Sequence, residues 1–93
     1  MNLKRVAIPP GETVSDLLEY HNISRTAFGK KIGMNEYQVK NLLKGNMKIT
    51  PELAEKLNET IGGDTQFWLN LEAIFRKDVA DGYPIRTAAR KFR

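Results

Sequence analysis

Apolar residues along this chain recur every three or four positions, which is the spacing of one face of an α-helix. No stretch alternates apolar and polar residues for long enough to indicate a strand, so we expect an all-α fold. The pattern predicts a first helix over about residues 13–21, after a turn at residues 9–11. Ser24 then stands as the N-cap of a short second helix, which Gly33 ends.

Three further helices follow from the same kinds of signal. Asn35 is the expected N-cap of a third helix, which Gly45 terminates. Thr50 precedes a proline, a residue that suits the first position of a helix, and the glycines at 62–63 end the fourth helix. Thr65 is predicted to cap a fifth. The pattern therefore indicates five helices in all.

The fifth helix is apolar around nearly its whole circumference. Its apolar residues are Phe67, Trp68, Leu69, Leu71, Ala73, Ile74 and Phe75. A surface helix of a monomer needs one apolar stripe, so this helix must be buried on more than one side. Because four short helices can cover one side only, we infer a homodimer, with Phe67, Trp68, Leu71, Ile74 and Phe75 as the interface candidates. The alternative is a central helix wrapped by the other four.

Helical periodicity fails beyond residues 81–84. We therefore divide the chain into one folded domain, residues 1–82, and a basic C-terminal tail, residues 83–93. The part of the chain from residue 85 onward is expected to be flexible, or ordered only by a partner.

Composition fits one small domain and excludes several classes of protein. The chain has 93 residues, of which 41% are apolar, with no cysteine and one histidine. Without cysteine there is no disulfide framework, thiolate metal site or cysteine nucleophile. The N-terminus leads into no apolar signal region, and no apolar run is long enough to span a membrane. We expect a cytoplasmic protein.

The net charge of +4 hides an uneven distribution. Residues 24–48 carry six bases and one acid, and residues 49–85 carry three bases and seven acids. Residues 86–93 carry four bases and no acid. A basic block within a folded domain is the electrostatic footprint of a nucleic-acid-binding face.

The same basic block has the spacing of two helices that cross steeply through a short turn. Such a crossing needs a small residue where the backbones approach and a glycine in the turn, and Gly29 and Gly33 stand at those positions. Apolar residues are needed on both sides, and these are Phe28, Ile32, Met34, Val39 and Leu42. The spacing predicts a helix-turn-helix whose second helix enters the DNA major groove.

Several short strings extend this likeness beyond a generic helix-turn-helix. They are Pro10-Gly11-Glu12, Gly33-Met34-Asn35, Leu42-Leu43-Lys44-Gly45, Ile49-Thr50-Pro51-Glu52 and Phe67-Trp68-Leu69-Asn70-Leu71. Over roughly residues 8–78 the chain resembles the HigA-type antitoxins of the Xre, or phage-repressor-like, helix-turn-helix family. It departs from the family pattern at Pro9, where histidine is usual, and at Gly29, where alanine is usual.

The resemblance implies a five-helix, lambda-repressor-like domain that acts without enzymatic activity of its own. It further implies a homodimer that binds a palindromic operator in its own promoter and neutralises a cognate RelE-like mRNA endoribonuclease toxin. The alternative is a stand-alone Xre-type transcriptional regulator without a toxin partner. A small hydrolase is a third hypothesis, but no catalytic set can be assembled around the single histidine.

Repressor-type domains read bases from the start of the second helix and the exposed face of the third. The base-reading candidates here are Arg25, Glu36, Tyr37, Gln38, Lys40 and Asn41. The phosphate candidates, in the segment that flanks the groove, are Lys44, Asn46 and Lys48. Lys30 and Lys31 could contact DNA or form a solvated helix face. Because the family usually has small polar or basic residues at positions 36 and 37, the operator sequence cannot be inferred.

No metal or cofactor site is expected. His21 is interpreted as a partly buried histidine at a helix end, since no second ligand lies nearby in sequence. Glu52, Glu55 and Glu59 are interpreted as the water-facing side of the fourth helix. The basic residues of the tail, Arg86, Arg90, Lys91 and Arg93, could contact phosphates, dock on a toxin or solubilise the chain end.

Overall fold

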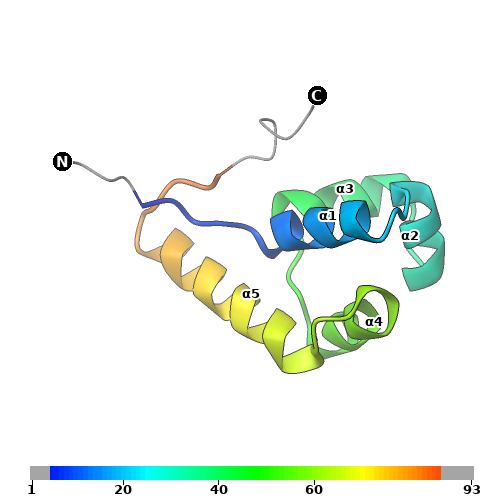
Figure 1. The fold of residues 1–93 in the computed structure, drawn as a ribbon. Helices are drawn as coiled ribbons and strands as arrows, with labels where there is room; N and C mark the ends of the chain where they lie inside the picture. The colour runs from blue at the N-terminus through cyan, green and yellow to red at the C-terminus, as the bar shows by residue number, and fades with distance from the viewer. Residues whose placement is uncertain (1–4, 87–93) are drawn as a thin grey trace.

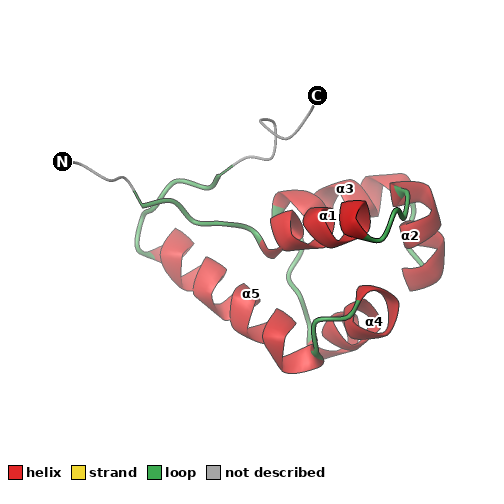
Figure 2. Cartoon of the chain, in the orientation of Figure 1, coloured by secondary structure: helices red, strands yellow, loops and turns green. Residues whose placement is uncertain are grey.

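The computed structural model describes residues 5–86, and all of its regular secondary structure is helical apart from one isolated bridge (Figures 1 and 2). The five helices are α1 (Pro10–Tyr20), α2 (Arg25–Ile32), α3 (Glu36–Lys44), α4 (Pro51–Ile61) and α5 (Thr65–Ala80). The predicted all-α, five-helix fold is confirmed. No helix in this described part is long and apolar enough to cross a membrane.

The second, third and fourth helices begin where their caps predict. The Ser24 side chain accepts a hydrogen bond from the Ala27 N–H at 3.1 Å, and Thr50 accepts one from the Leu53 N–H at 3.2 Å. The Asn35 side chain caps α3 in the same way. Each of these side chains satisfies an N–H that has no partner within its own helix, which fixes where the helix starts.

The first and last helices differ from prediction at their starts. α1 begins at Pro10, three residues before the predicted start, because proline suits a first helical turn. Gly11 follows inside the helix, and a Cβ there would overlap the backbone of Leu43, so only glycine lets α1 lie this close to α3. The predicted Thr65 cap is wrong: Asp64 is the N-cap residue, and its side chain makes no capping bond.

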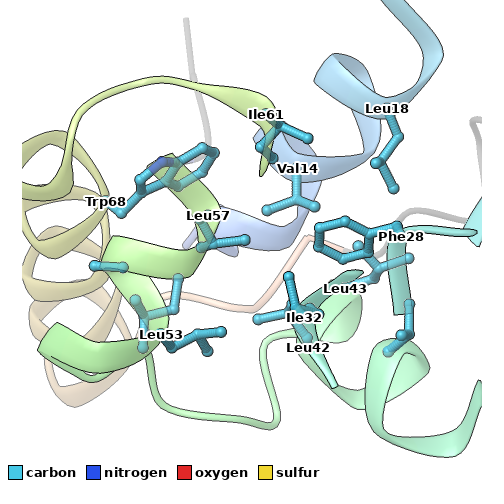
Figure 3. Close-up of a cluster of buried hydrophobic side chains, with 13 residues drawn as sticks. Val14, Leu18, Phe28, Ile32, Leu42, Leu43, Leu53, Leu57, Ile61 and Trp68 are labelled. Atoms are coloured by element: carbon cyan, nitrogen blue, oxygen red, sulfur yellow. The ribbon is translucent and has the colours of Figure 1, made fainter. Parts of the chain in front are cut away.

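The hydrophobic core lies between α1, α2, α3 and α4, with Trp68 of α5 reaching in from one side (Figure 3). The Trp68 indole N–H donates to the Gly62 carbonyl oxygen at 2.8 Å, so the one polar atom of this ring is satisfied. α5 lies along the edge of the bundle beside α4 (Figure 1). The alternative of a central helix wrapped by the other four is therefore wrong.

Burial divides the five predicted interface residues into two groups. Trp68 and Phe75 are 0% and 1% exposed within a single chain, so they belong to the core, and this part of the interface prediction needs correction. Phe67 is 39% exposed and Ile74 is 55% exposed, while Leu71 is half-buried. The apolar circumference seen in the sequence is thus a core face plus a narrower exposed stripe.

The segment after α5 packs against the segment before α1. The Ala7 N–H donates to the Pro84 carbonyl oxygen at 2.8 Å, and the Arg86 N–H donates to the Ala7 carbonyl oxygen at 2.9 Å. The Arg86 guanidinium donates to both oxygens of the buried Glu12 carboxylate, at 2.7 and 2.9 Å. These hydrogen bonds raise the pKa of Arg86 further above its ordinary value.

The predicted boundary between domain and tail therefore needs correction, because residues 83–86 belong to the folded domain. The expectation of a flexible or partner-ordered chain from residue 85 onward is wrong for residues 85 and 86. Arg90, Lys91 and Arg93 lie outside the described residues.

Candidate nucleic-acid interface

The turn between α2 and α3 is built on two glycines. Gly33 adopts the left-handed conformation, with φ 75° and ψ 33°, and ends α2. A Cβ at Gly29 would lie 2.6 Å from the Met34 carbonyl oxygen and 3.1 Å from a methyl group of Val39. The predicted need for a small residue at this crossing is confirmed. α2 and α3 thus meet at the short distance typical of a helix-turn-helix.

Most of the base-reading candidates share one exposed surface. Glu36, Tyr37, Gln38 and Lys40 are exposed on α3, and the Tyr37 side chain is 73% accessible. Arg25, at the start of α2, lines a shallow hollow together with Glu36, Tyr37 and Lys40. The structure therefore brings together residues that stand eleven to fifteen positions apart in the sequence.

Asn41 lies at the margin of this surface. It is half-buried, and its backbone carbonyl oxygen accepts a hydrogen bond from the Asn46 N–H at 2.9 Å. Its side chain thus has less freedom to approach a base than those of Gln38 or Lys40.

Gln38 has a structural role that the base-reading prediction did not include. Its side-chain oxygen accepts from the Asn35 N–H at 2.9 Å, while the Asn35 side chain accepts from the Gln38 N–H at 2.8 Å. This reciprocal pair is a capping box. Because the Gln38 oxygen is directed at the helix terminus, the amide NH2 group is the part left to contact DNA.

Five lysines of this region are exposed without an ion pair among the described residues. Lys30, Lys31, Lys40, Lys44 and Lys48 are all exposed, and none forms an ion pair with any residue between 5 and 86. Asn46 is also exposed, between Lys44 and Lys48. Uncompensated lysines around a helix are suited to contact phosphates on either side of a groove.

One contact at the end of α3 was not predicted. The Arg76 guanidinium of α5 donates to the Gly45 carbonyl oxygen at 3.0 Å. The two residues stand 31 positions apart, so no local pattern signals their contact. Arg76 therefore links the end of the exposed basic surface to α5.

The histidine and acidic side chains of the described region are dispersed rather than grouped. Between residues 5 and 86 no three histidine or acidic side chains group in a way that could hold a metal ion. His21 is exposed and packs edge-on against Tyr20, so the prediction of a partly buried histidine is wrong. Glu52, Glu55 and Glu59 are exposed on α4, which confirms that they form its water-facing side.

Comparison with known proteins gives a curated relative and several solved structures of similar fold. No protein-family model matches the chain. The uncharacterized HTH-type transcriptional regulator YddM of Escherichia coli K12 is 35% identical over 63 residues, which are 68% of this chain and 67% of YddM.

Three solved structures are similar along most of the chain. An addiction-module antidote protein of the HigA family from Coxiella burnetii has a TM-score of 0.71 at 27% identity, over 82% of this chain and 84% of its own. A putative antidote protein of a plasmid maintenance system from Nostoc punctiforme has a TM-score of 0.72 at 26% identity, over the same shares. PA4674 of Pseudomonas aeruginosa, solved with its 28-bp operator DNA, has a TM-score of 0.70 at 25% identity, over 80% and 82%.

The crossing of α2 and α3, the exposed face of α3 and these similarities agree. The chain belongs to the Xre-like helix-turn-helix family of HigA-type antitoxins and HTH-type transcriptional regulators.

Proposed function

We propose that this chain is a cytoplasmic antitoxin and autorepressor that binds a palindromic operator as a homodimer and neutralises a RelE-like mRNA endoribonuclease. The observation that carries the DNA-binding part is the exposed α3 face with exposed lysines beside it, none of which forms an ion pair with another residue between 5 and 86. A structure of similar fold, PA4674, is described in complex with its operator DNA.

The roles of the side chains follow from their positions. We assign Arg25, Gln38 and Lys40 to base edges in the major groove, with Glu36, Tyr37 and Asn41 beside them. We assign Lys44, Asn46 and Lys48 to phosphates at the groove edge. Base contacts select the sequence, and phosphate contacts supply affinity that depends on salt.

The homodimer rests on the exposed stripe of α5. Phe67, Leu71 and Ile74 are spaced by four and three residues, so they lie along one face of the helix. Leu71 and Ile74 also line a hollow together with Val6 and Ile8 of the N-terminal segment. A second copy of the same stripe would cover these side chains and place two copies of α3 on one DNA duplex.

The antitoxin role rests on the HigA-family and plasmid-maintenance antidote proteins that share this fold. The second candidate function is a stand-alone transcriptional regulator, which the similarity to YddM favours. The two differ in one respect only, namely the presence of a toxin partner.

Exchanging Gln38 for glutamate separates DNA reading from helix capping. Gln38→Glu keeps an oxygen for the capping box but removes the NH2 donor, so the melting temperature should stay unchanged. The wild type is first used to select a duplex from a random pool. The difference in binding free energy between this duplex and a scrambled one should then fall by about 1–3 kcal/mol in the variant. Gln66→Glu, which adds the same charge to the exposed start of α5, is the control. Unchanged discrimination in Gln38→Glu would contradict the role of Gln38 as a reader.

Removing Lys44 and Lys48 together should weaken binding to all sequences alike. The slope of log K against log salt is negative, and each lost phosphate contact makes it less steep by about 0.9. Lys44→Ala/Lys48→Ala should therefore reduce its steepness by about 2. The control, Lys56→Ala/Lys77→Ala, removes two charges from α4 and α5. The slopes are measured by fluorescence anisotropy titration at several salt concentrations. An equal loss of steepness in both variants would show that net charge alone determines the salt dependence.

The wild-type chain should be a dimer in light scattering at micromolar concentration. Ile74→Glu places a charge in the exposed stripe of α5, and we expect it to shift the protein to monomer. Ala73→Glu, on the adjoining polar side of the same helix, should leave the dimer intact. A monomeric wild type, or a dimeric Ile74→Glu variant, would contradict the proposed interface.

Co-expression with the neighbouring open reading frame tests the toxin partner. An antitoxin should co-purify with the neighbouring product and relieve the growth arrest that the product causes on its own. If no adjacent gene encodes a small basic protein, or if its product neither arrests growth nor binds this chain, the stand-alone regulator is the correct assignment.

A further inference from the structure

The C-terminal end of α3 is contacted by two side chains of α5, Arg76 and Phe75. Gly45 ends the helix with φ 87° and ψ 12°, and the N–H groups of Gly45 and Asn46 bond back to carbonyl oxygens of the last turn. The carbonyl oxygen of Gly45 has its partner outside the helix, in the Arg76 guanidinium at 3.0 Å. A positive group at this helix end is also favoured by the helix dipole.

Arg76 is itself held in a fixed orientation. Its Nε–H donates to the Glu72 carboxylate at 2.6 Å, one turn earlier on α5. The guanidinium carbon lies 4.8 Å from the centre of the Phe75 ring, and a Cβ at Gly45 would lie 2.9 Å from that ring. Contacts within α5 therefore orient the guanidinium toward the end of α3.

The Glu72–Arg76 pair is an inefficient way to stabilise a small domain. The Glu72 side chain is 6% exposed and the Arg76 side chain is 39% exposed, and the second Glu72 oxygen is buried with no hydrogen-bond partner among the described residues. Buried ion pairs can often be replaced by apolar residues without loss of stability, because removing the charges from water offsets their attraction. What apolar residues cannot replace is the directed hydrogen bond to Gly45.

We propose that Arg76, oriented by Glu72, is a positioning residue for DNA recognition. It fixes the end of α3, and the phosphate-contacting segment 44–48 that follows, relative to α5. Since α5 also carries the proposed dimer stripe, this contact sets the separation of the two recognition helices and hence the preferred spacing of operator half-sites. The inference rests on the proposed DNA binding as a dimer.

The test replaces the pair with apolar residues and measures half-site spacing. In Glu72→Leu/Arg76→Met we expect a melting temperature equal to or above that of the wild type and an intact dimer. Affinity for the selected operator should fall about tenfold, and the preference over operators with one base pair added or removed between half-sites should largely disappear. Affinity for scrambled DNA should not change.

A matched control lies on the same helix. Lys77 and Asp81 form an exposed pair of the same spacing at 3.0 Å, and neither is hydrogen-bonded to α3. Lys77→Met/Asp81→Leu should keep the spacing preference of the wild type. A purely structural role for Glu72 and Arg76 would instead lower the melting temperature and weaken all DNA binding in parallel.

The outcomes separate this inference from the proposed function. If the wild type selects an operator and Glu72→Leu/Arg76→Met keeps the same affinity and spacing preference, the inference is overturned while the function stands. If the wild type selects no sequence, the function and the inference fail together. Should the double variant not fold, Glu72→Gln/Arg76→Met also removes the donor to Gly45 without leaving a buried charge, and a retained spacing preference there overturns the inference.

Discussion

The close crossing of α2 and α3 at Gly29 is the constraint on which the rest of the surface depends. No side chain separates the backbone of α2 from the Met34 carbonyl oxygen at this point. The crossing directs Val39 and Leu42 into the core and leaves Tyr37, Gln38 and Lys40 on the outside. A larger residue at position 29 would displace the turn, and with it every side chain that α3 presents.

The two ends of α3 are fixed by different means. At the N-terminal end, Asn35 and Gln38 cap the helix with their own side chains, and the contact is entirely local. At the C-terminal end, Gly45 is held by Arg76 of another helix. The first arrangement determines where α3 begins, and the second links its end to α5. A helix held in this way is preorganised for a rigid partner such as a DNA duplex.

The helix starts that depend on contacts between neighbouring residues were predicted from the sequence. Ser24, Asn35 and Thr50 cap helices as expected, since each bonds an N–H three residues ahead. The capping-box role of Gln38 was also predictable, because it stands three residues after Asn35. The helical start at Pro10 was missed although proline in a first helical turn is a local signal, because Gly11 beside it is typical of a turn, and only its contact with Leu43 explains a glycine inside the helix.

Contacts over long separations account for two further errors. Periodicity marked Trp68 and Phe75 as apolar but could not tell whether their own chain or a second one covers them. The Arg86–Glu12 pair joins residues 74 positions apart, and a basic chain end with no helical pattern is otherwise typical of a free tail. Charge patterning located the basic surface correctly because its residues are contiguous in sequence between positions 24 and 48.

A backbone amide NMR titration with a selected operator duplex locates the DNA-binding surface residue by residue. If DNA binds across α2 and α3, the largest shift changes should occur at Arg25, from Tyr37 to Lys40 and from Lys44 to Lys48. The amides of Glu52, Glu55 and Glu59 on α4 should change little. Shift changes concentrated on α4, with α3 unaffected, would show that DNA binds elsewhere.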